Sequence, residues 1–299
     1  MKAVRLQDYG DVNQFRLEDA PEPTPKAGEV VIEVAASGLN PVDLYIRQGY
    51  MKQYTPMDLP AIQGIDAAGT ITALGEGVTG FAVGDRVVGH LPINGAGAHA
   101  EKAIVPVAGL ARLPANLSFE AGATLPLVGL TGRDAVDALG VTPGQRVLVA
   151  GALGAVGRAA VQYIKELGAV AVAGVRASRL DEGRALAGEA IDIDTASGAQ
   201  FDHAVSAAPA VAAKVPALVK DGGTVASVVQ TPPEANPGER VKVASIWTQD
   251  NPAKLKAIVD AAARGELQIP IAKTFPLAEL SAAHSALATA PHGKIVVTH

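Results

Sequence analysis

The sequence predicts an α/β protein in which a β-rich first part precedes a parallel sheet of alternating strands and helices. In the first third, β-branched runs such as EVVIEV (29–34) and TITAL (70–74) are separated by frequent glycines, a pattern typical of a small folded-over barrel. From about residue 118, the apolar runs RVLVA, AVAVAG, FDHAVSA and TVASVV alternate with stretches of helical periodicity. Strands separated by helices favour a parallel sheet.

The helical stretches carry start and stop signals. Ser118 begins one short helix, and the stretch TGRDAVDALG predicts a second that stops at Gly140. The stretch after RVLVA is amphipathic, with apolar residues at helical spacing and Gly168 as its stop. Further helices are expected at 211–220 and 275–289, before a closing strand at 294–299.

Composition limits the classes of protein that fit. A chain of 299 residues with 48% apolar and 18% charged residues suits a globular protein of two domains. The net charge of −5, with scattered basic residues, argues against a nucleic-acid partner. No apolar run approaches the roughly 18 residues of a membrane span, and the N-terminus lacks a signal-peptide core, so we expect a cytoplasmic protein without a membrane partner. The absence of cysteine excludes disulfides, thiol nucleophiles and thiolate metal sites.

A turn of small residues, GALGAVG (151–157), lies between the strand RVLVA and an amphipathic helix. A dinucleotide-binding turn needs small residues for a tight bend, for close approach to the pyrophosphate, and for helix packing. Ala152, Gly154 and Gly157 stand at those three places, and the helix that follows points free N–H groups at the phosphates. The residues expected to contact a dinucleotide here are Ala152, Gly154, Ala155, Val156 and Gly157.

The end of the next strand indicates which dinucleotide binds. An NAD site places an acidic residue there, about 20 residues after the turn, to accept hydrogen bonds from the ribose. After Gly174 this chain instead has Arg176, Ser178 and Arg179, and no acid precedes Asp181. Guanidinium groups and a hydroxyl suit the 2′-phosphate of NADP(H). The alternative is a solvated loop that happens to be basic.

Several longer motifs along the chain match one family. They include MKAVRLQDYG, EVVIEVAASGLNPVDLYIRQG, LPAIQGIDAAGTITALG, GQRVLVAGALGAVGRAAVQ and the C-terminal GKIVVTH. Over essentially its full length the chain resembles the zinc-independent quinone oxidoreductases, the zeta-crystallin-like branch of the medium-chain dehydrogenase/reductase superfamily. The resemblance implies a GroES-like catalytic domain at 1–118 and 265–299, and a Rossmann NADP-binding domain at 119–264. It also implies a cofactor cleft between the domains and a homodimer formed through Rossmann edge strands, with 241–247 as the candidate edge.

The chain departs from the zinc-dependent cousins where these bind metal. Asn40 stands where they have a catalytic cysteine, and Ile65-Asp66 stands where they have the His-Glu of a ligand pair. His90, His99 and Glu101 lack the spacing of a metal site. We therefore expect no metal.

The resemblance also suggests which residues act. Asn40 is expected near the nicotinamide and the acceptor, and Thr131 near the nicotinamide ribose. Tyr45 and Tyr54 are candidates to hydrogen-bond the acceptor oxygen or to relay a proton. Each has a structural alternative, since Asn40 could shape a turn with the proline that follows it and either tyrosine could serve packing. A further expectation from spacing alone is an ion pair between Asp43 and Arg47, four residues apart.

The leading hypothesis is an NADPH-dependent oxidoreductase that transfers a hydride to a quinone or another conjugated carbonyl. Such acceptors are already electrophilic, so they need positioning in a dry site more than a Lewis acid. One alternative is an enone or alkenal reductase of the same superfamily, acting on a carbon–carbon double bond. Another is a non-enzymatic NADPH-binding sensor or structural protein.

Overall fold

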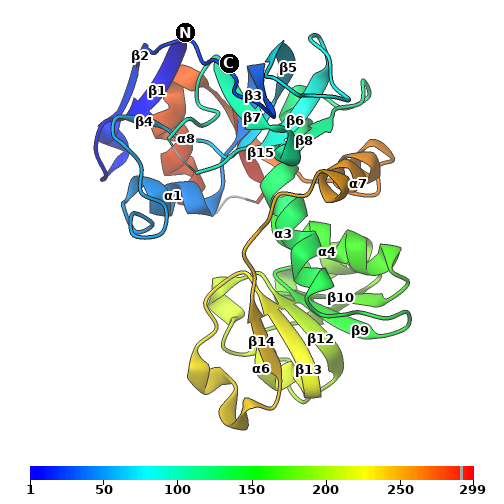
Figure 1. Cartoon of the computed structure of the whole chain (residues 1–299). Helices are drawn as coiled ribbons and strands as arrows, with labels where there is room; N and C mark the ends of the chain where they lie inside the picture. The colour runs from blue at the N-terminus through cyan, green and yellow to red at the C-terminus, as the bar shows by residue number, and fades with distance from the viewer. Residues whose placement is uncertain (94, 290–291) are drawn as a thin grey trace. The chain divides into compact units, whose positions relative to one another are not determined.

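The computed structural model describes residues 1–93, 95–289 and 292–299 of the chain (Figure 1). The backbone divides into two units, and the chain passes from the first to the second within helix α3 (Pro126–Asp137). The first unit comprises residues 1–127, 250–265 and 269–299, and the second comprises residues 128–249 and 266–268.

The described part of the first unit contains a large and a small sheet. The large sheet has seven strands in the order β15-β16-β3-β5-β6-β8, with β7 paired to β3. The small sheet has the order β2-β1-β4. Because β16 pairs with β3, the last strand of the chain joins a sheet built mainly from its first third. The strands are β1 (Lys2–Leu6), β2 (Phe15–Asp19), β3 (Glu29–Gly38), β4 (Ala61–Ile62), β5 (Asp66–Leu74), β6 (Arg86–His90), β7 (Lys102–Pro106), β8 (Leu110–Arg112), β15 (Ile271–Pro276) and β16 (Lys294–Thr298).

Short helices cover the sheets of the first unit. Helix α2 approaches β3 so closely that a Cβ on Gly38 would lie 2.3 Å from the carbonyl oxygen of Ala123. Helix α8 packs on β15 and β16 and buries Leu280 and Ala283 in an apolar core. The helices of this unit are η1 (Val12–Gln14), α1 (Pro41–Arg47), η2 (Val107–Gly109), α2 (Phe119–Ala123), α7 (Pro252–Ala263), η7 (Leu277–Glu279) and α8 (Leu280–Leu287).

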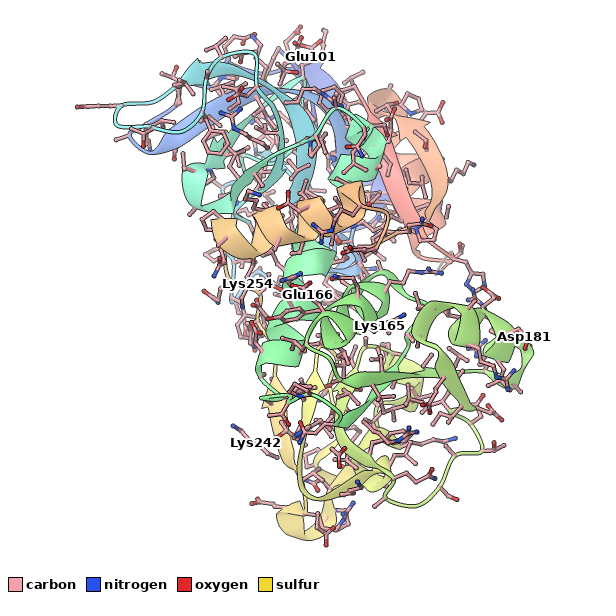
Figure 2. All side chains as sticks on the ribbon, turned by 90° about the vertical axis from the view of Figure 1, so that its right-hand side faces the viewer. Glu101, Lys165, Glu166, Asp181, Lys242 and Lys254 are labelled. Atoms are coloured by element: carbon pink, nitrogen blue, oxygen red, sulfur yellow. The ribbon has the colours of Figure 1, made fainter. Side chains whose placement is uncertain are left out.

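The second unit is built on a parallel sheet of six strands in the order β11-β10-β9-β12-β13-β14. Strand β14 pairs only with β13 and forms one edge of the sheet. Figure 2 shows Lys242 on β14 and Asp181, on a helix beside the opposite edge, at the two sides of this unit. The strands are β9 (Arg146–Ala150), β10 (Val170–Val175), β11 (Glu189–Asp192), β12 (Phe201–Ser206), β13 (Val219–Ser227) and β14 (Lys242–Ser245).

Helices lie on both faces of this sheet, because side chains alternate between faces along each strand. Val147 and Val149 of β9 pack with α3 and α4 on one face. Leu148 packs with Val215 and Leu218 on the other. The helices of this unit, besides α3, are α4 (Ala155–Glu166), η3 (Ala177–Arg179), α5 (Leu180–Ala187), η4 (Pro209–Val211), α6 (Val215–Leu218), η5 (Pro233–Ala235) and η6 (Pro237–Glu239).

Most elements expected from the sequence are present. The predicted runs RVLVA, AVAVAG, FDHAVSA and TVASVV lie in parallel strands, and Ser118 caps α2 by accepting a hydrogen bond from the N–H of Ala121. The helix expected at 211–220 forms only in part. The short helix η4 ends at Val211 and α6 covers Val215–Leu218, because the β-branched Val219 already pairs with β12 and begins β13. Strand β11, a half-exposed edge strand with charged residues at both ends, was missed.

The structure thus confirms the α/β class, with a parallel sheet in the second unit. Within the described ranges, every helix is too short or too polar to cross a membrane.

Candidate functional site

The glycine turn of the second unit joins β9 to α4. Gly151 follows the strand with a φ of 85°, and its N–H donates to the carbonyl oxygen of Gly174 on β10. Gly154 is the N-cap of α4, in extended conformation. The tight bend is therefore made at Gly151. Residue 152 can be alanine because it does not need a positive φ, and its methyl group packs in the core.

The two other glycines of the turn are constrained in different ways. A Cβ on Gly157 would lie 2.3 Å from the carbonyl oxygen of Gly151 and 2.7 Å from the Cα of Ala152, so α4 can approach the turn only if residue 157 is glycine. A Cβ on Gly154 would meet only the oxygen of Gly151, at 3.3 Å. The space at Gly154 is open, and the first N–H groups of α4 point out of the helix beside it. This cradle fits a pyrophosphate.

The basic residues after β10 differ in their side-chain contacts. Arg176 is exposed and its side chain has no hydrogen-bond partner within the described chain. Arg179 is held by Glu182, with Nε and Nη2 lying 2.8 and 2.5 Å from the two carboxylate oxygens. This contact raises the pKa of Arg179. Of the two guanidinium groups expected to suit a 2′-phosphate, that of Arg179 therefore already has a counter-charge.

Thr131 lies in α3 of the second unit and is 9% exposed. Its Oγ1 lies 2.5 Å from the Oγ1 of Thr248. Its expected place beside the nicotinamide ribose stays a prediction.

In the first unit, three strand ends bring Asn40, Asp66 and Lys294 together. Asp66 begins β5 and pairs with Gly38 at the end of β3, and Val296 of β16 pairs with the same glycine. Asn40 follows β3 as the N-cap of α1. The sheet register thus places the three side chains at one end of the sheet, although they are far apart in the sequence.

These three side chains form a buried polar cluster, which we call the Asn40 cluster. The Nζ of Lys294 lies 2.5 Å from the Oδ1 of Asn40 and 3.1 Å from the Oδ2 of Asp66. The Nδ2 of Asn40 donates to the same Asp66 oxygen at 2.9 Å, and the N–H of Leu127 donates to the other at 2.8 Å. Asn40 is 1% exposed and Asp66 fully buried. The side chain of Asn40 therefore already has partners within the first unit.

Asp43 lies beside this cluster and is fully buried. Its Oδ2 accepts a hydrogen bond from the N–H of Asn40 at 2.7 Å, while its Oδ1 has no partner within the described chain. Burial raises the pKa of Asp43 to about 7. The expected ion pair with Arg47 is wrong, because Asp43 instead caps its own helix and the guanidinium makes no salt bridge in the described structure.

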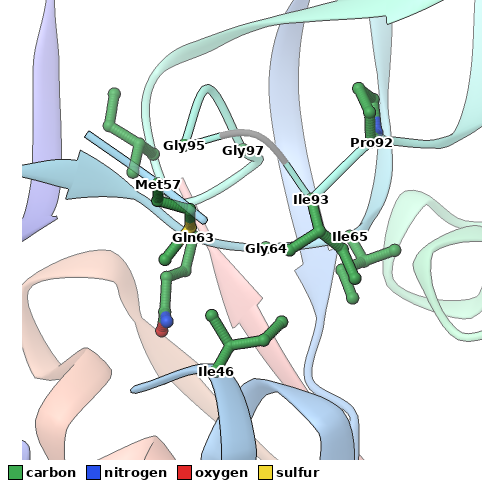
Figure 3. A pocket seen from close by; sticks show the side chains of 10 residues that line it. Ile46, Met57, Gln63, Gly64, Ile65, Pro92, Ile93, Gly95 and Gly97 are labelled. Atoms are coloured by element: carbon green, nitrogen blue, oxygen red, sulfur yellow. The ribbon is translucent and has the colours of Figure 1, made fainter. Parts of the chain in front are cut away.

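A small hollow, open to solvent, lies in the first unit beside α1 and β4 (Figure 3). Its walls are mainly apolar, including Ile46, Met57, Ile65 and Ile93. Gln63 also lines it, is 4% exposed, and has no hydrogen-bond partner for either amide atom among the described residues. Sequence reasoning missed Gln63; the available signal was a polar residue within an apolar run directly before a glycine.

The two candidate tyrosines lie on the surface rather than in the Asn40 cluster. Tyr45 is 49% and Tyr54 72% exposed, and neither lines the hollow beside Gln63. The ring of Tyr45 lies 6.5 Å from that of Tyr50. Neither phenol hydroxyl has a partner in the part of the chain that the structure describes. Their roles toward an acceptor stay predictions.

The histidines considered for metal binding lie in separate settings. His90 pairs with Asp250, with Nδ1 and Oδ1 2.6 Å apart, and His99 is fully buried beside the hydroxyl of Ser37. Among the described residues, no three histidine, aspartate or glutamate side chains are placed to hold a metal ion. The donor set at Asp66 does not fit a metal either, because its oxygens already accept hydrogen bonds from an ammonium, an amide and a backbone N–H.

Comparison with known proteins identifies the family. Models of the alcohol dehydrogenase GroES-like domain and of zinc-binding dehydrogenase match residues 26–115 and 167–297. The chain is 35% identical to the mouse (Mus musculus) synaptic vesicle membrane protein VAT-1 homolog-like over 58% of this chain and 41% of that protein. It is 38% identical to human quinone oxidoreductase over 56% and 50% of the two chains, and 36% identical to a tomato (Solanum lycopersicum) 2-methylene-furan-3-one reductase over 56% and 45%. The matches thus span half or less of these relatives.

Solved structures of other proteins match the fold of this chain over its whole length. The structure of an NAD-dependent alcohol dehydrogenase has a TM-score of 0.88 at 28% identity, covering 100% of both chains. The quinone oxidoreductase from Coxiella burnetii has a TM-score of 0.87 at 25% identity, covering 100% of this chain and 99% of that one. The chain belongs to the medium-chain dehydrogenase/reductase superfamily, as its motifs predicted, and combines a GroES-like and a Rossmann-type domain. Several of the similar proteins are named as oxidoreductases, among them a quinone oxidoreductase and an NAD-dependent alcohol dehydrogenase.

Lys294→Met is expected to lower the free energy of unfolding by about 3 kcal/mol or more, because Asp66 is left as a buried charge without its cation. Urea unfolding followed by circular dichroism measures the change. The double variant Lys294→Met/Asp66→Asn removes the uncompensated charge and should regain part of the loss. Equal stability of wild type and Lys294→Met would contradict the contribution assigned to this ion pair.

Asp43→Asn is expected to change how stability depends on pH. Because the pKa of Asp43 is raised from 3.8 to about 7, the folded state keeps a proton that the unfolded state loses, and wild-type stability falls as pH rises between these values. The variant should gain on wild type by up to a few kcal/mol from pH 4 to 8, since one pKa unit is worth about 1.4 kcal/mol. Burial lowers the pKa of His99 and His284 in both proteins, so their opposite effect cancels in the difference. A difference that stays constant with pH would show that Asp43 ionises normally.

Proposed function

We propose that this protein is an NADPH-dependent oxidoreductase that reduces quinones or other conjugated carbonyl compounds without a metal. The observation that carries the proposal is the glycine turn of the second unit, followed one strand later by basic residues where an NAD site would have an acid. Similarity to proteins named quinone oxidoreductase supports the acceptor class.

The second unit provides the residues for the cofactor. Gly154 leaves room for the pyrophosphate, and the N–H groups of Ala155 and Val156 start a helix whose positive end favours anionic groups. Arg176, Ser178 and Arg179 follow the strand β10, at whose end the adenosine ribose binds in this fold. When bound, NADPH supplies a hydride.

The first unit provides a candidate acceptor site. The hollow beside α1 is lined by apolar side chains and one buried amide, that of Gln63, and this lining matches the chemistry of a conjugated group with few polar atoms. Conjugated acceptors need orientation and exclusion of water more than a Lewis acid. At Asn40 and Asp66 the ammonium group of Lys294 provides a fixed positive charge within the fold.

Two further proposals follow from the same family. The name of the tomato relative favours reduction of a carbon–carbon double bond as a second candidate activity. The outer edge of β14 has no partner strand among the described residues, and the exposed Trp247 follows the strand closely. This edge supports a homodimer formed through β14.

Anaerobic mixing with NADPH and a panel of quinones and enones tests the activity, followed as loss of NADPH absorbance. We expect loss with quinones, slower loss when NADH replaces NADPH, and an unchanged rate after treatment with a metal chelator. Loss with enones alone would favour the second candidate. Binding of NADPH without oxidation by any acceptor would contradict both activities.

Gly154→Ala is expected to weaken NADPH binding at least about tenfold, because the added methyl group occupies the space open to the pyrophosphate. Its free energy of unfolding should stay within about 1 kcal/mol of wild type, since its backbone angles are open to alanine. Gly157→Ala is the contrasting variant, and should lose stability itself through overlap with the oxygen of Gly151. Calorimetric titration and urea unfolding measure the two effects. Unchanged NADPH affinity in Gly154→Ala would contradict the cradle.

A further inference from the structure

Arg158 places a basic side chain beside the glycine turn. It directly follows Gly157 in the first turns of α4, at a position that helical spacing assigns to a solvated face. In the structure its Nε instead donates to the carbonyl oxygen of Leu153, inside the turn, at 3.1 Å. This contact holds the guanidinium beside the turn. Its two Nη groups have no hydrogen-bond partner in the described part of the chain and remain available as a fork.

A second cation, Arg179, follows the neighbouring strand β10 and acts on Arg158 through its charge. The pKa of Arg158 is lowered by partial burial and by the positive charge of Arg179, and is partly restored by Glu182. The two guanidinium groups thus repel each other, and the single carboxylate of Glu182 acts on both. Such an arrangement is unfavourable by itself and is relieved when a multiply charged anion binds between the cations.

We propose that Arg158 binds the 2′-phosphate of NADPH together with Arg179 and thereby determines the preference for NADPH over NADH. The inference rests on the proposed function and names a residue of the same site. The fork of Arg158 suits a bidentate contact with phosphate oxygens. Arg179 adds the second positive charge near the proposed phosphate, and Glu182, its ion-pair partner, opposes phosphate binding.

The position of Arg179 favours the 2′-phosphate over the pyrophosphate as the bound group. Arg179 follows β10, at the strand end where the adenosine ribose lies in a Rossmann fold. The pyrophosphate has its own donors in the first N–H groups of α4 beside Gly154. Arg158 connects the two places, since its Nε is bonded to the glycine turn, the N–H of Gly151 in that turn donates to Gly174 near the end of β10, and the charge of Arg179 acts on its guanidinium.

Calorimetric titration of the whole protein with NADPH, NADH, adenosine 2′,5′-bisphosphate and 5′-AMP tests this role without any turnover. Arg158→Gln should weaken NADPH and the bisphosphate by about 10- to 100-fold, as expected for lost charge-assisted hydrogen bonds, and change NADH and 5′-AMP by less than about threefold. Glu182→Gln should tighten the 2′-phosphorylated ligands. Arg184→Gln is the matched control, because it removes an arginine of the same unit that pairs with Asp181, and should leave all four affinities nearly unchanged.

The outcomes separate this inference from the proposed function. Wild-type protein that binds neither dinucleotide, or that prefers NADH, overturns both. Wild-type preference for NADPH with unchanged affinities in Arg158→Gln overturns only the role of Arg158. Equal weakening of NADPH and NADH in that variant, with urea unfolding unchanged, assigns Arg158 to the pyrophosphate and also overturns the inference.

Discussion

The close approach of α4 to the end of β9 is the constraint on which the second unit depends. A helix can start so near a strand end only if residue 157 has no side chain, because the carbonyl oxygen of Gly151 occupies the place of its Cβ. The same approach leaves the N-terminus of α4 open at Gly154, and Arg158 of this helix bonds back to Leu153 in the turn. The packing of α4 and the proposed binding of a pyrophosphate therefore depend on the same close approach.

The first unit has a corresponding constraint in the Asn40 cluster. The resemblance places Asn40 and Asp66 where the zinc-dependent cousins have metal-site residues, and here a lysine from the last strand bonds to both side chains. A buried ion pair of this kind offers little net stability over apolar packing, yet breaking it is unfavourable. The cluster also ties the C-terminal strand to the first third of the chain, so the ends of this unit depend on each other.

Local features were predictable from the sequence, and long-range ones were not. The glycine turn, the stop at Gly140 and the cap at Ser118 depend on neighbouring residues, and the sequence indicated each of them. The bend was expected at Ala152 but lies at Gly151, which alone of the two has a positive φ. The partner of Asn40 could not be predicted, because Lys294 reaches it only through the register of three strands.

Other differences between prediction and structure arise because tertiary contacts determine side-chain conformation, burial and helix ends that the local sequence pattern does not specify. Arg158 fits a solvated helix face by spacing, and only its side-chain conformation turns it back to Leu153. Gln63 gave little signal, since burial of one amide in an apolar wall cannot be inferred without the fold. The expected helix at 211–220 forms only in part because sheet pairing at Val219 competes with helix continuation.

Amide hydrogen exchange with and without NADPH tests most directly whether the glycine turn is a dinucleotide cradle. We expect saturating NADPH to slow exchange at the backbone N–H groups of residues 152–158 and 176–179, with little change at the outer edge strand β14. Exchange at both segments that is unaffected by a saturating concentration of NADPH would contradict this account of the second unit.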